Sequence, residues 1–178
     1  MSDLDNIIQQ IGDNSAPPVH LWKPDFCGDI NIHIDAQGVW FHEGTPIGRE
    51  SLVNLFASVL WYEDDEYYLV TPVEKMRITV DDVPFIVVNA GCTGGRWVAA
   101  TKPVNSIMIS EANPVELRCY KGDWVPYLCV RYNLWARVNR NVYYQWIDAA
   151  LAFQGECDPA QGLSLTSGTY RFPIAKEL

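Results

Sequence analysis

The chain has 178 residues, 48% of them hydrophobic, so it can bury a substantial core as one domain or as two smaller ones. Its 22 acidic and 13 basic residues give a formal net charge of −9. This field repels nucleic-acid polymers and anionic membrane surfaces, so we expect neither as a partner. A small anionic ligand in a local basic pocket remains compatible with the composition.

The sequence also bears on the cellular location of the protein and on whether it holds disulfides or a metal. No segment approaches the roughly 20 apolar residues that cross a bilayer, and the first 18 residues lack the basic and apolar regions of a secretory signal. We therefore expect a cytoplasmic protein. The five cysteines form an odd set without a C-x-x-C pair, which indicates neither a disulfide framework nor a structural zinc site. We predict no cofactor and no bound metal.

The chain begins with a helix pattern that gives way to an extended segment. Apolar residues at helical spacing over 4–11 predict a short amphipathic helix. Three prolines in "NSAPPVHLWKPDF" then favour an extended linker. We assign residues 1–18 to this N-terminal helix and linker.

The apolar period becomes two over residues 29–34, which predicts a strand. "DAQG" then turns the chain into a second strand, "VWFH", and Glu43-Gly44 turns it again into the short strand "TPI". Pro46 donates no ladder hydrogen bond, so this third strand belongs at a sheet edge or a bulge. With an even-numbered loop, three side chains lie on one polar face of the hairpin: His33, Trp40 and His42. Two histidines without a third ligand are weak evidence for a metal.

A helical pattern follows over residues 49–61, and its apolar stripe should cover the sheet. After the turn "EDDE", four runs predict strands: "YYLVTP", "KMRITV", "PFIVVNA" and "RWVAAT". The loop "GCTGGR" lacks both the Lys-Ser/Thr ending and the following helix of a phosphate-binding loop, so we interpret it as a flexible hairpin loop.

The second half repeats the order of elements found in the first. Residues 115–150 contain three strand patterns and a helix pattern, in the same order as residues 29–60. We predict an α+β fold of two similar lobes, each an antiparallel sheet with one packed helix in the order β-β-β-α-β, made by duplication. Chance recurrence of common elements is the alternative. The predicted lobes are residues 19–95 and 96–178.

Five motifs occur in order over residues 17–85: "PPVHLW", "FCGDI", "GTPIGR", "LVTPVEK" and "PF". They resemble a bacterial family of uncharacterised proteins, domain of unknown function 1285, and a weaker match continues through "YLCVRYNLWARVNRNVYY". The resemblance implies two duplicated α+β lobes, the second superficially like pleckstrin-homology folds. It also implies a nucleotide-like ligand at the lobe interface and a role in signalling. Where the family has "VRGGL", this chain has "VRYNL", so bulkier residues occupy that turn.

Cations near strand and helix ends are the best candidates for a binding site. Arg49 precedes a helix, where a cation is unfavourable unless an acid or a bound anion compensates it. A pocket for a small anion would draw its charges and hydrogen bonds from six residues: Thr45, Arg49, Thr71, Glu74, Lys75 and Arg131. Alternatively, Glu74 and Lys75 are two solvated charges on a surface turn.

These observations favour a non-enzymatic protein that binds a small anionic or nucleotide-like ligand between two lobes. The alternative is a protein-interaction module without such a ligand. An enzyme ranks third, because no nucleophile is paired with a base in the sequence.

Overall fold

A computed structural model describes residues 3–11, 17–153 and 162–176. The chain forms two compact units, Met1–Pro84 and Phe85–Leu178. The predicted boundary after residue 95 would separate two strands that pair as one hairpin, at 85–93 and 96–102. None of the helices within the described ranges is long and apolar enough to span a membrane.

The described residues of the first unit form one six-stranded sheet and two α-helices. Its elements in chain order are α1 (Asp3–Ile11), the 3-10 helix η1 (Val19–Leu21), β1 (Phe26–Ile34), β2 (Trp40–His42), β3 (Thr45–Pro46), α2 (Glu50–Ser58), β4 (Leu60–Glu63), β5 (Glu66–Val70) and β6 (Lys75–Val80). The strand order is β3-β2-β1-β6-β5-β4. All neighbours are antiparallel except β1 and β6, which are parallel. As predicted from Pro46, β3 is an edge strand.

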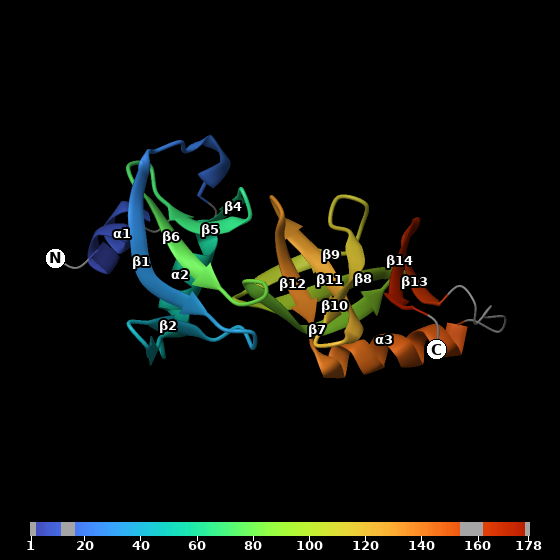
Figure 1. Cartoon of the computed structure of the whole chain (residues 1–178). Helices are drawn as coiled ribbons and strands as arrows, with labels where there is room; N and C mark the ends of the chain where they lie inside the picture. The colour runs from blue at the N-terminus through green and yellow to red at the C-terminus, as the bar shows by residue number, and fades with distance from the viewer. Residues whose placement is uncertain (1–2, 12–16, 154–161, 177–178) are drawn as a thin grey trace. The chain divides into compact units, whose positions relative to one another are not determined.

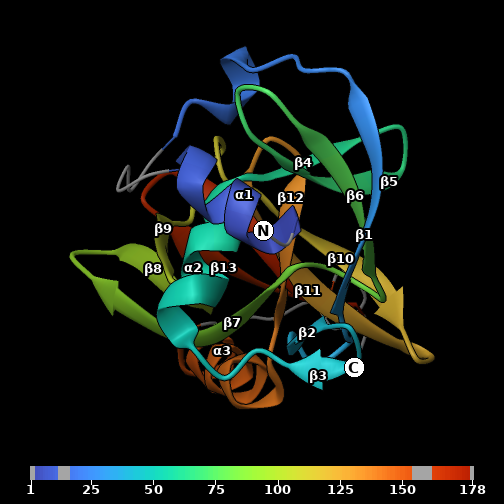
Figure 2. The ribbon, with the colours of Figure 1, turned by 90° about the vertical axis from the view of Figure 1, so that its left-hand side faces the viewer.

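One face of this sheet is buried under its helices. The alternating isoleucines of β1, Ile30, Ile32 and Ile34, are at most 8% exposed. Trp40 on β2 stacks on Phe56 of α2, with ring centroids 6.4 Å apart. Both α1 and α2 lie on this side of the sheet (Figure 1 and Figure 2). The apolar stripe of α2 therefore covers the sheet as predicted, and no helix among the described residues of this unit lies on the opposite face.

The helix predicted to reach residue 61 is shorter than expected. It ends at Ser58, and Leu60 begins β4, where it pairs with Leu69. The prediction was wrong because buried Val59 and Leu60 continue the helical apolar pattern although their backbone has left the helix. Periodicity alone does not separate these two states over so few residues.

The first hairpin also differs from the prediction in the face on which His33 lies. Ile34 pairs with Trp40, so the loop between them has five residues, an odd number. His33 pairs with Phe41, whereas His42 pairs with Ile32. His33 therefore lies on the opposite face from Trp40 and His42, and the prediction of one shared face was wrong.

The second unit has the same sheet plan with an added strand pair. Its elements are β7 (Phe85–Thr93), β8 (Arg96–Lys102), β9 (Asn105–Met108), β10 (Val115–Tyr120), β11 (Asp123–Arg131), β12 (Leu134–Val138), α3 (Arg140–Phe153), β13 (Leu163–Ser167) and β14 (Tyr170–Ala175). The strand order is β10-β11-β12-β7-β8-β9, with β12 and β7 parallel. The predicted glycine-rich loop between β7 and β8 is a tight hairpin, because Gly94 and Gly95 adopt positive φ angles of 60° and 75°.

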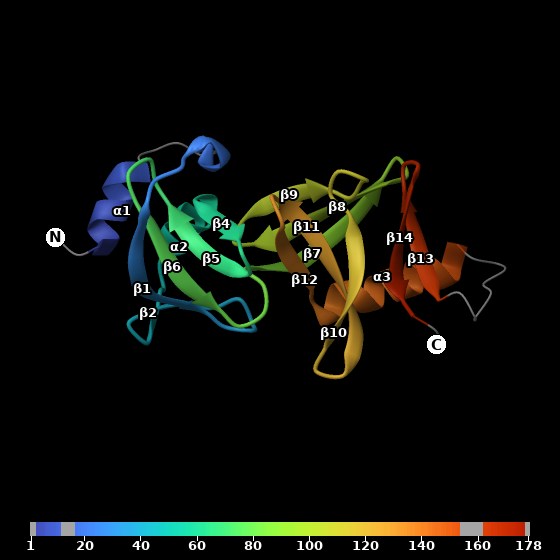
Figure 3. The ribbon, with the colours of Figure 1, turned by 45° about the horizontal axis from the view of Figure 1, so that its top comes forward.

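An aromatic cluster forms the centre of the second unit. Trp146 of α3 is fully buried and packs edge-on against Trp97 of β8 and Phe172 of β14. The separate pair β13–β14 lies beside α3 (Figure 3) and contacts it. The C-terminal strands thus complete the core that α3 begins.

The predicted duplication of an α+β unit is confirmed, but the matching elements differ from those expected. Each sheet consists of two antiparallel groups of three strands, or meanders: β1–β3 and β4–β6 in the first unit, β7–β9 and β10–β12 in the second. In each sheet the first strand of the first meander pairs in parallel with the last strand of the second meander, so both sheets have the same strand order. The sheets are therefore mixed rather than purely antiparallel. In the sequence, β1–β3 with α2 looked like β10–β12 with α3, because each is three strands followed by a helix. The helix occupies a different place in the two units, and this hid the true correspondence.

Candidate functional site

Three of the six predicted ligand-binding residues lie together at the turn between β5 and β6: Thr71, Glu74 and Lys75. Thr71 is fully buried, and its hydroxyl donates to the side-chain oxygen of Gln10 in α1. The same hydroxyl accepts a hydrogen bond from the backbone N–H of Glu74 at 3.0 Å. The side-chain nitrogen of Gln10 donates to the Glu74 carboxylate at 3.3 Å. Thr71 and Glu74 therefore fasten α1 to this turn.

The charge of Lys75 is engaged within its own sheet. Its ammonium group forms an ion pair with the Glu63 carboxylate on β4 and lies 4.3 Å from the centroid of the Tyr68 ring. The Lys75 side chain is 17% exposed. A ligand at this position would have to compete with both contacts.

Thr45 and Arg49 flank the short segment that leads from β3 into α2. Both are exposed. Arg49 is the N-cap residue of α2, and its side chain makes no capping hydrogen bond. Within the described part of the chain, the Arg49 side chain also forms no ion pair. Glu50 follows it in the first helical turn, and this acid offsets the unfavourable position of the cation near the helix N-terminus.

Arg131 belongs to the second unit, whereas the five other predicted residues belong to the first. Its guanidinium carbon lies 5.6 Å from the centroid of the Phe85 ring. The pKa of Arg131 is lowered because burial disfavours its charged form. The side chain thus packs against the core of its unit.

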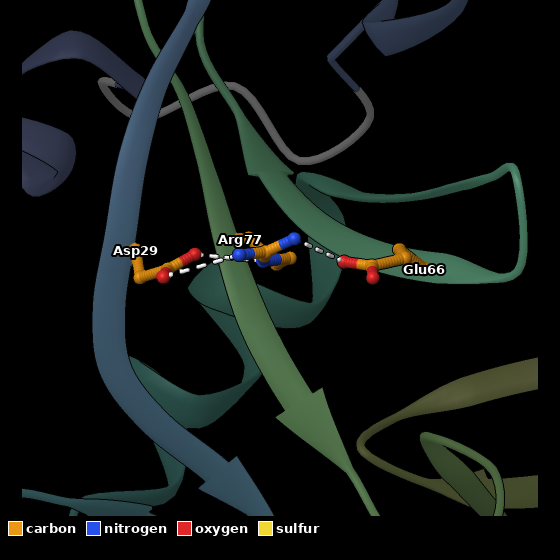
Figure 4. A network of polar contacts seen from close by, with 3 residues as sticks. All are labelled: Asp29, Glu66 and Arg77. Carbon is orange, nitrogen blue, oxygen red and sulfur yellow. Dashed lines mark hydrogen bonds and ion pairs between the residues drawn. The ribbon is translucent and has the colours of Figure 1, made fainter.

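A charged group that the sequence analysis did not select lies on the uncovered face of the first sheet. Arg77 of β6 donates two hydrogen bonds to the Asp29 carboxylate, from Nε at 2.7 Å and from Nη2 at 3.2 Å. Its Nη1 donates to Glu66 of β5 at 3.0 Å. Figure 4 shows Arg77 between these two carboxylates, one from each neighbouring strand. We call this the Arg77 bridge.

Electrostatics hold the Arg77 bridge in its charged form. The hydrogen bond from Arg77 lowers the pKa of the Asp29 carboxyl group, and the two carboxylates raise the pKa of the guanidinium. The three side chains are 40–64% exposed. An isolated exposed ion pair contributes little to folding stability, but a bidentate arginine–carboxylate pair within a network of three charges contributes more.

A hollow of about 650 Å³ lies beside the Arg77 bridge, and all its lining residues belong to β1, β5, β6 and the β4–β5 turn. We call it the outer hollow. Its polar lining residues are Asp29, Asn31, Asp65, Glu66, Arg77 and Thr79. Acids thus outnumber the cation in this lining three to one.

Aromatic side chains adjoin the same bridge. The Phe26 ring is 54% exposed and meets Tyr68 edge-on, with centroids 6.1 Å apart. The guanidinium carbon of Arg77 lies 5.6 Å from the Phe26 ring centroid. The uncovered face of the sheet therefore combines charged groups with exposed apolar surface.

Charge is divided unequally between the two units. Residues up to Pro84 include 15 acids and four bases, a formal net charge of −11, whereas those from Phe85 onward include seven acids and nine bases, a net charge of +2. Of the four bases in the first unit, Lys75 and Arg77 are already paired with carboxylates. The first unit therefore attracts cations.

The histidines do not assemble a metal centre. His33 Nε2 lies 2.8 Å from an Asp81 carboxylate oxygen, and its ring stacks on Phe41. Within residues 3–11, 17–153 and 162–176, no three His, Cys, Asp or Glu side chains are grouped so that they could hold a metal ion.

The comparisons with known proteins agree with this architecture. Residues 17–83 match the "Domain of unknown function (DUF1285), N-terminal domain", and residues 84–174 match the "Protein of unknown function (DUF1285), C-terminal domain". The chain belongs to the DUF1285 family. The border between the two DUF1285 domains falls where the structure divides into its two units.

Two solved DUF1285 structures resemble the chain. The protein from Silicibacter pomeroyi DSS-3 is 36% identical, has a TM-score of 0.88, and aligns over 99% of this chain and 96% of that one. The protein from Shewanella baltica OS155 is 28% identical, has a TM-score of 0.55, and aligns over 66% of this chain and 90% of that one. No curated protein matches the chain. The family is thus established by fold and sequence, and its name states no activity.

Proposed function

We propose that this DUF1285 protein is a non-enzymatic interaction module that contacts a partner protein through the uncovered face of its first sheet. The Arg77 bridge beside the outer hollow carries this proposal, because its charged groups are held in fixed positions on an open surface. The exposed Phe26 ring next to them offers apolar contact area. A signalling role, which the family resemblance implies, is part of this proposal.

Charge reversal at two exposed acids of the first unit tests the module. Glu66→Lys changes the uncovered face, whereas the matched variant Glu43→Lys changes an acid in the β2–β3 turn, outside the lining of the outer hollow. We expect the tagged wild-type chain and Glu43→Lys to enrich the same proteins from a bacterial lysate, and Glu66→Lys to lose them. Quantitative mass spectrometry measures the enrichment. Equal enrichment by all three chains would refute a role for this face.

A second candidate function is binding of a small anionic or nucleotide-like ligand near the start of α2. It is favoured by Arg49, whose exposed guanidinium forms no ion pair within the described residues, and by the exposed hydroxyl-bearing residue Thr45 in the strand just before it. The charge of −11 on the first unit opposes this function, because it repels anions at longer range.

Thermal-shift measurements with nucleotides and inorganic phosphate separate the two candidates. If a ligand binds at Arg49, it should raise the Tm of the wild-type chain and of the control variant Lys23→Ala by the same amount, and it should not raise the Tm of Arg49→Ala. Lys23 is a suitable control because it is an exposed base of the same unit. An unchanged Tm across the whole panel would remove the small-anion candidate.

A further inference from the structure

The outer hollow contains hydrogen-bond acceptors that the fold leaves unused. Glu66 accepts a hydrogen bond from Arg77 through Oε2, so its other carboxylate oxygen, Oε1, is available to a further donor. Asp65 accepts a hydrogen bond from the Tyr62 hydroxyl through Oδ1 at 2.9 Å, which leaves Oδ2. Within the described chain, the side chains of Asn31 and Thr79 make no hydrogen bond. These groups form an acceptor-rich lining for a ligand with several N–H donors.

The negative charge around the outer hollow favours cationic ligands over anionic ones. Three carboxylates and one guanidinium line the outer hollow, and the first unit as a whole carries a charge of −11. An anion entering the hollow would meet this excess of negative charge, whereas an ammonium or guanidinium group would be attracted to it. Both of those groups are also pure donors, and therefore complement the free acceptor oxygens.

The exposed aromatic surface suits a long basic side chain better than a small ion. Phe26 already has one guanidinium at 5.6 Å from its ring centroid and is still 54% exposed. Lysine and arginine have apolar stems that cover such rings while their charged ends reach polar groups. A segment of a protein chain can supply the stem and the charge together.

We infer that the partner presents a basic segment to the uncovered face, with a lysine or arginine side chain in the outer hollow. This inference rests on the proposed interaction function and adds the chemical class of the partner. Electrostatic attraction to the acidic unit then speeds the encounter, and the hollow selects the basic side chain.

Binding of labelled peptides, followed by fluorescence anisotropy, tests this inference. Three short peptides of equal length carry lysine and arginine, serine, or glutamate at the same positions. The test variant is Asp65→Asn, which removes one charge from the hollow and keeps an acceptor for the Tyr62 hydroxyl. The matched control is Glu50→Gln, which removes one charge from the same unit on the covered side.

We expect only the basic peptide to bind, about threefold more weakly to Asp65→Asn than to wild type or Glu50→Gln. Raising the salt from about 50 mM to about 300 mM should weaken binding further. Equal losses in both variants would show non-specific attraction to net charge and overturn the inference. Equal binding of the serine peptide would also overturn it, while the lysate experiment still decides the interaction function separately.

Spermidine serves as a competitor that separates a protein segment from a free polyamine, since both carry ammonium groups. For a protein segment, spermidine displaces the basic peptide only at a large excess, because it lacks the peptide's other contacts. Displacement at concentrations equal to the peptide would assign the hollow to a small polycation and overturn the proposed partner class.

Discussion

The two units have the same strand order but net charges of opposite sign, and their packed helices occupy different places in the chain order. Both sheets consist of two meanders joined through one parallel pair, β1 with β6 and β12 with β7. The first unit carries a charge of −11 and the second +2. In the first unit the packed helix lies between the meanders in sequence, and in the second it follows both.

This comparison shows which properties a duplicated sheet retains. Strand order depends on buried apolar alternation, which both units keep, as in Ile30, Ile32 and Ile34 of β1 and Trp97 and Ala99 of β8. Surface charge is free to diverge, because exposed substitutions change stability little. A difference in function between the units should therefore reside in their surfaces, where the Arg77 bridge lies.

The largest effects should come from removing one aromatic ring from either core. Phe56 of α2 and Phe172 of β14 are both fully buried. Replacing either by alanine should lower the free energy of unfolding of its own unit by about 3–5 kcal/mol, because the ring leaves a cavity. Hydrogen exchange, followed peptide by peptide, should show faster exchange within Met1–Pro84 for Phe56→Ala and within Phe85–Leu178 for Phe172→Ala.

Truncations of exposed apolar side chains serve as controls, with Val39→Ala in the first unit and Val104→Ala in the second. These should leave exchange unchanged in both units. If Phe56→Ala accelerated exchange equally throughout the chain, the units would unfold as one, and the comparison between two separate cores would fail.

A smaller effect should follow from removing the buried hydroxyl that fastens α1, an element without a counterpart in the second sheet. Thr71→Val keeps the shape but leaves the Glu74 backbone N–H and the Gln10 amide oxygen without this partner. We expect a loss of about 1–3 kcal/mol in the unfolding free energy of the first unit, measured by urea denaturation.

The conservative variant Thr71→Ser retains the hydroxyl and should stay within about 1 kcal/mol of wild type. Hydrogen exchange of α1 should accelerate in Thr71→Val alone. Equal stability of the valine and serine variants would show that the hydroxyl does not anchor the helix.

The elements with strong local patterns were predictable from the sequence, including β1, α1 and the edge position of Pro46. Short strands were not. Leu60 continues the helical apolar pattern of α2, and only its pairing with Leu69, nine residues later in the chain, makes it a strand. Such pairing depends on tertiary contacts, which sequence periodicity does not record.

The Arg77 bridge was missed for a related reason. Arg77 alternates with buried Met76 and Ile78 in β6, a pattern that indicates only an exposed position. Its partners come from β1 and β5, and the parallel pairing of β1 with β6 places Asp29 directly beside Arg77. A search for oppositely charged residues at outward strand positions would have proposed the group, but not the register that joins it. The predicted six-residue site keeps its status as a prediction.

Cysteine reactivity offers a local comparison within the second unit. Cys119 on β10 is exposed, whereas burial raises the pKa of the Cys129 thiol on the neighbouring strand. Because the thiolate is the reactive form, iodoacetamide should modify Cys129 roughly tenfold more slowly than Cys119 near pH 8. Mass spectrometry of digested protein measures both rates in one sample, and in urea the two should become equal. Equal rates in the native protein would contradict the burial of Cys129.

The smallest expected effect is the acid sensitivity that the Arg77 bridge gives to the first unit. Arg77 lowers the pKa of Asp29 in the folded state, so the bridge contributes stability above the ordinary carboxyl pKa of about 4 and loses it as the pH falls through the lowered value. Asp29→Asn should therefore be less stable than wild type at neutral pH. The two should converge as the pH falls below about 3, in urea midpoints followed on the first unit. The matched variant Asp25→Asn removes an exposed acid just before β1 that forms no ion pair within the described residues, and its urea midpoint should stay close to that of the wild type at neutral pH. A constant difference between wild type and Asp29→Asn at every pH would mean that the carboxylate acts through its shape rather than its charge.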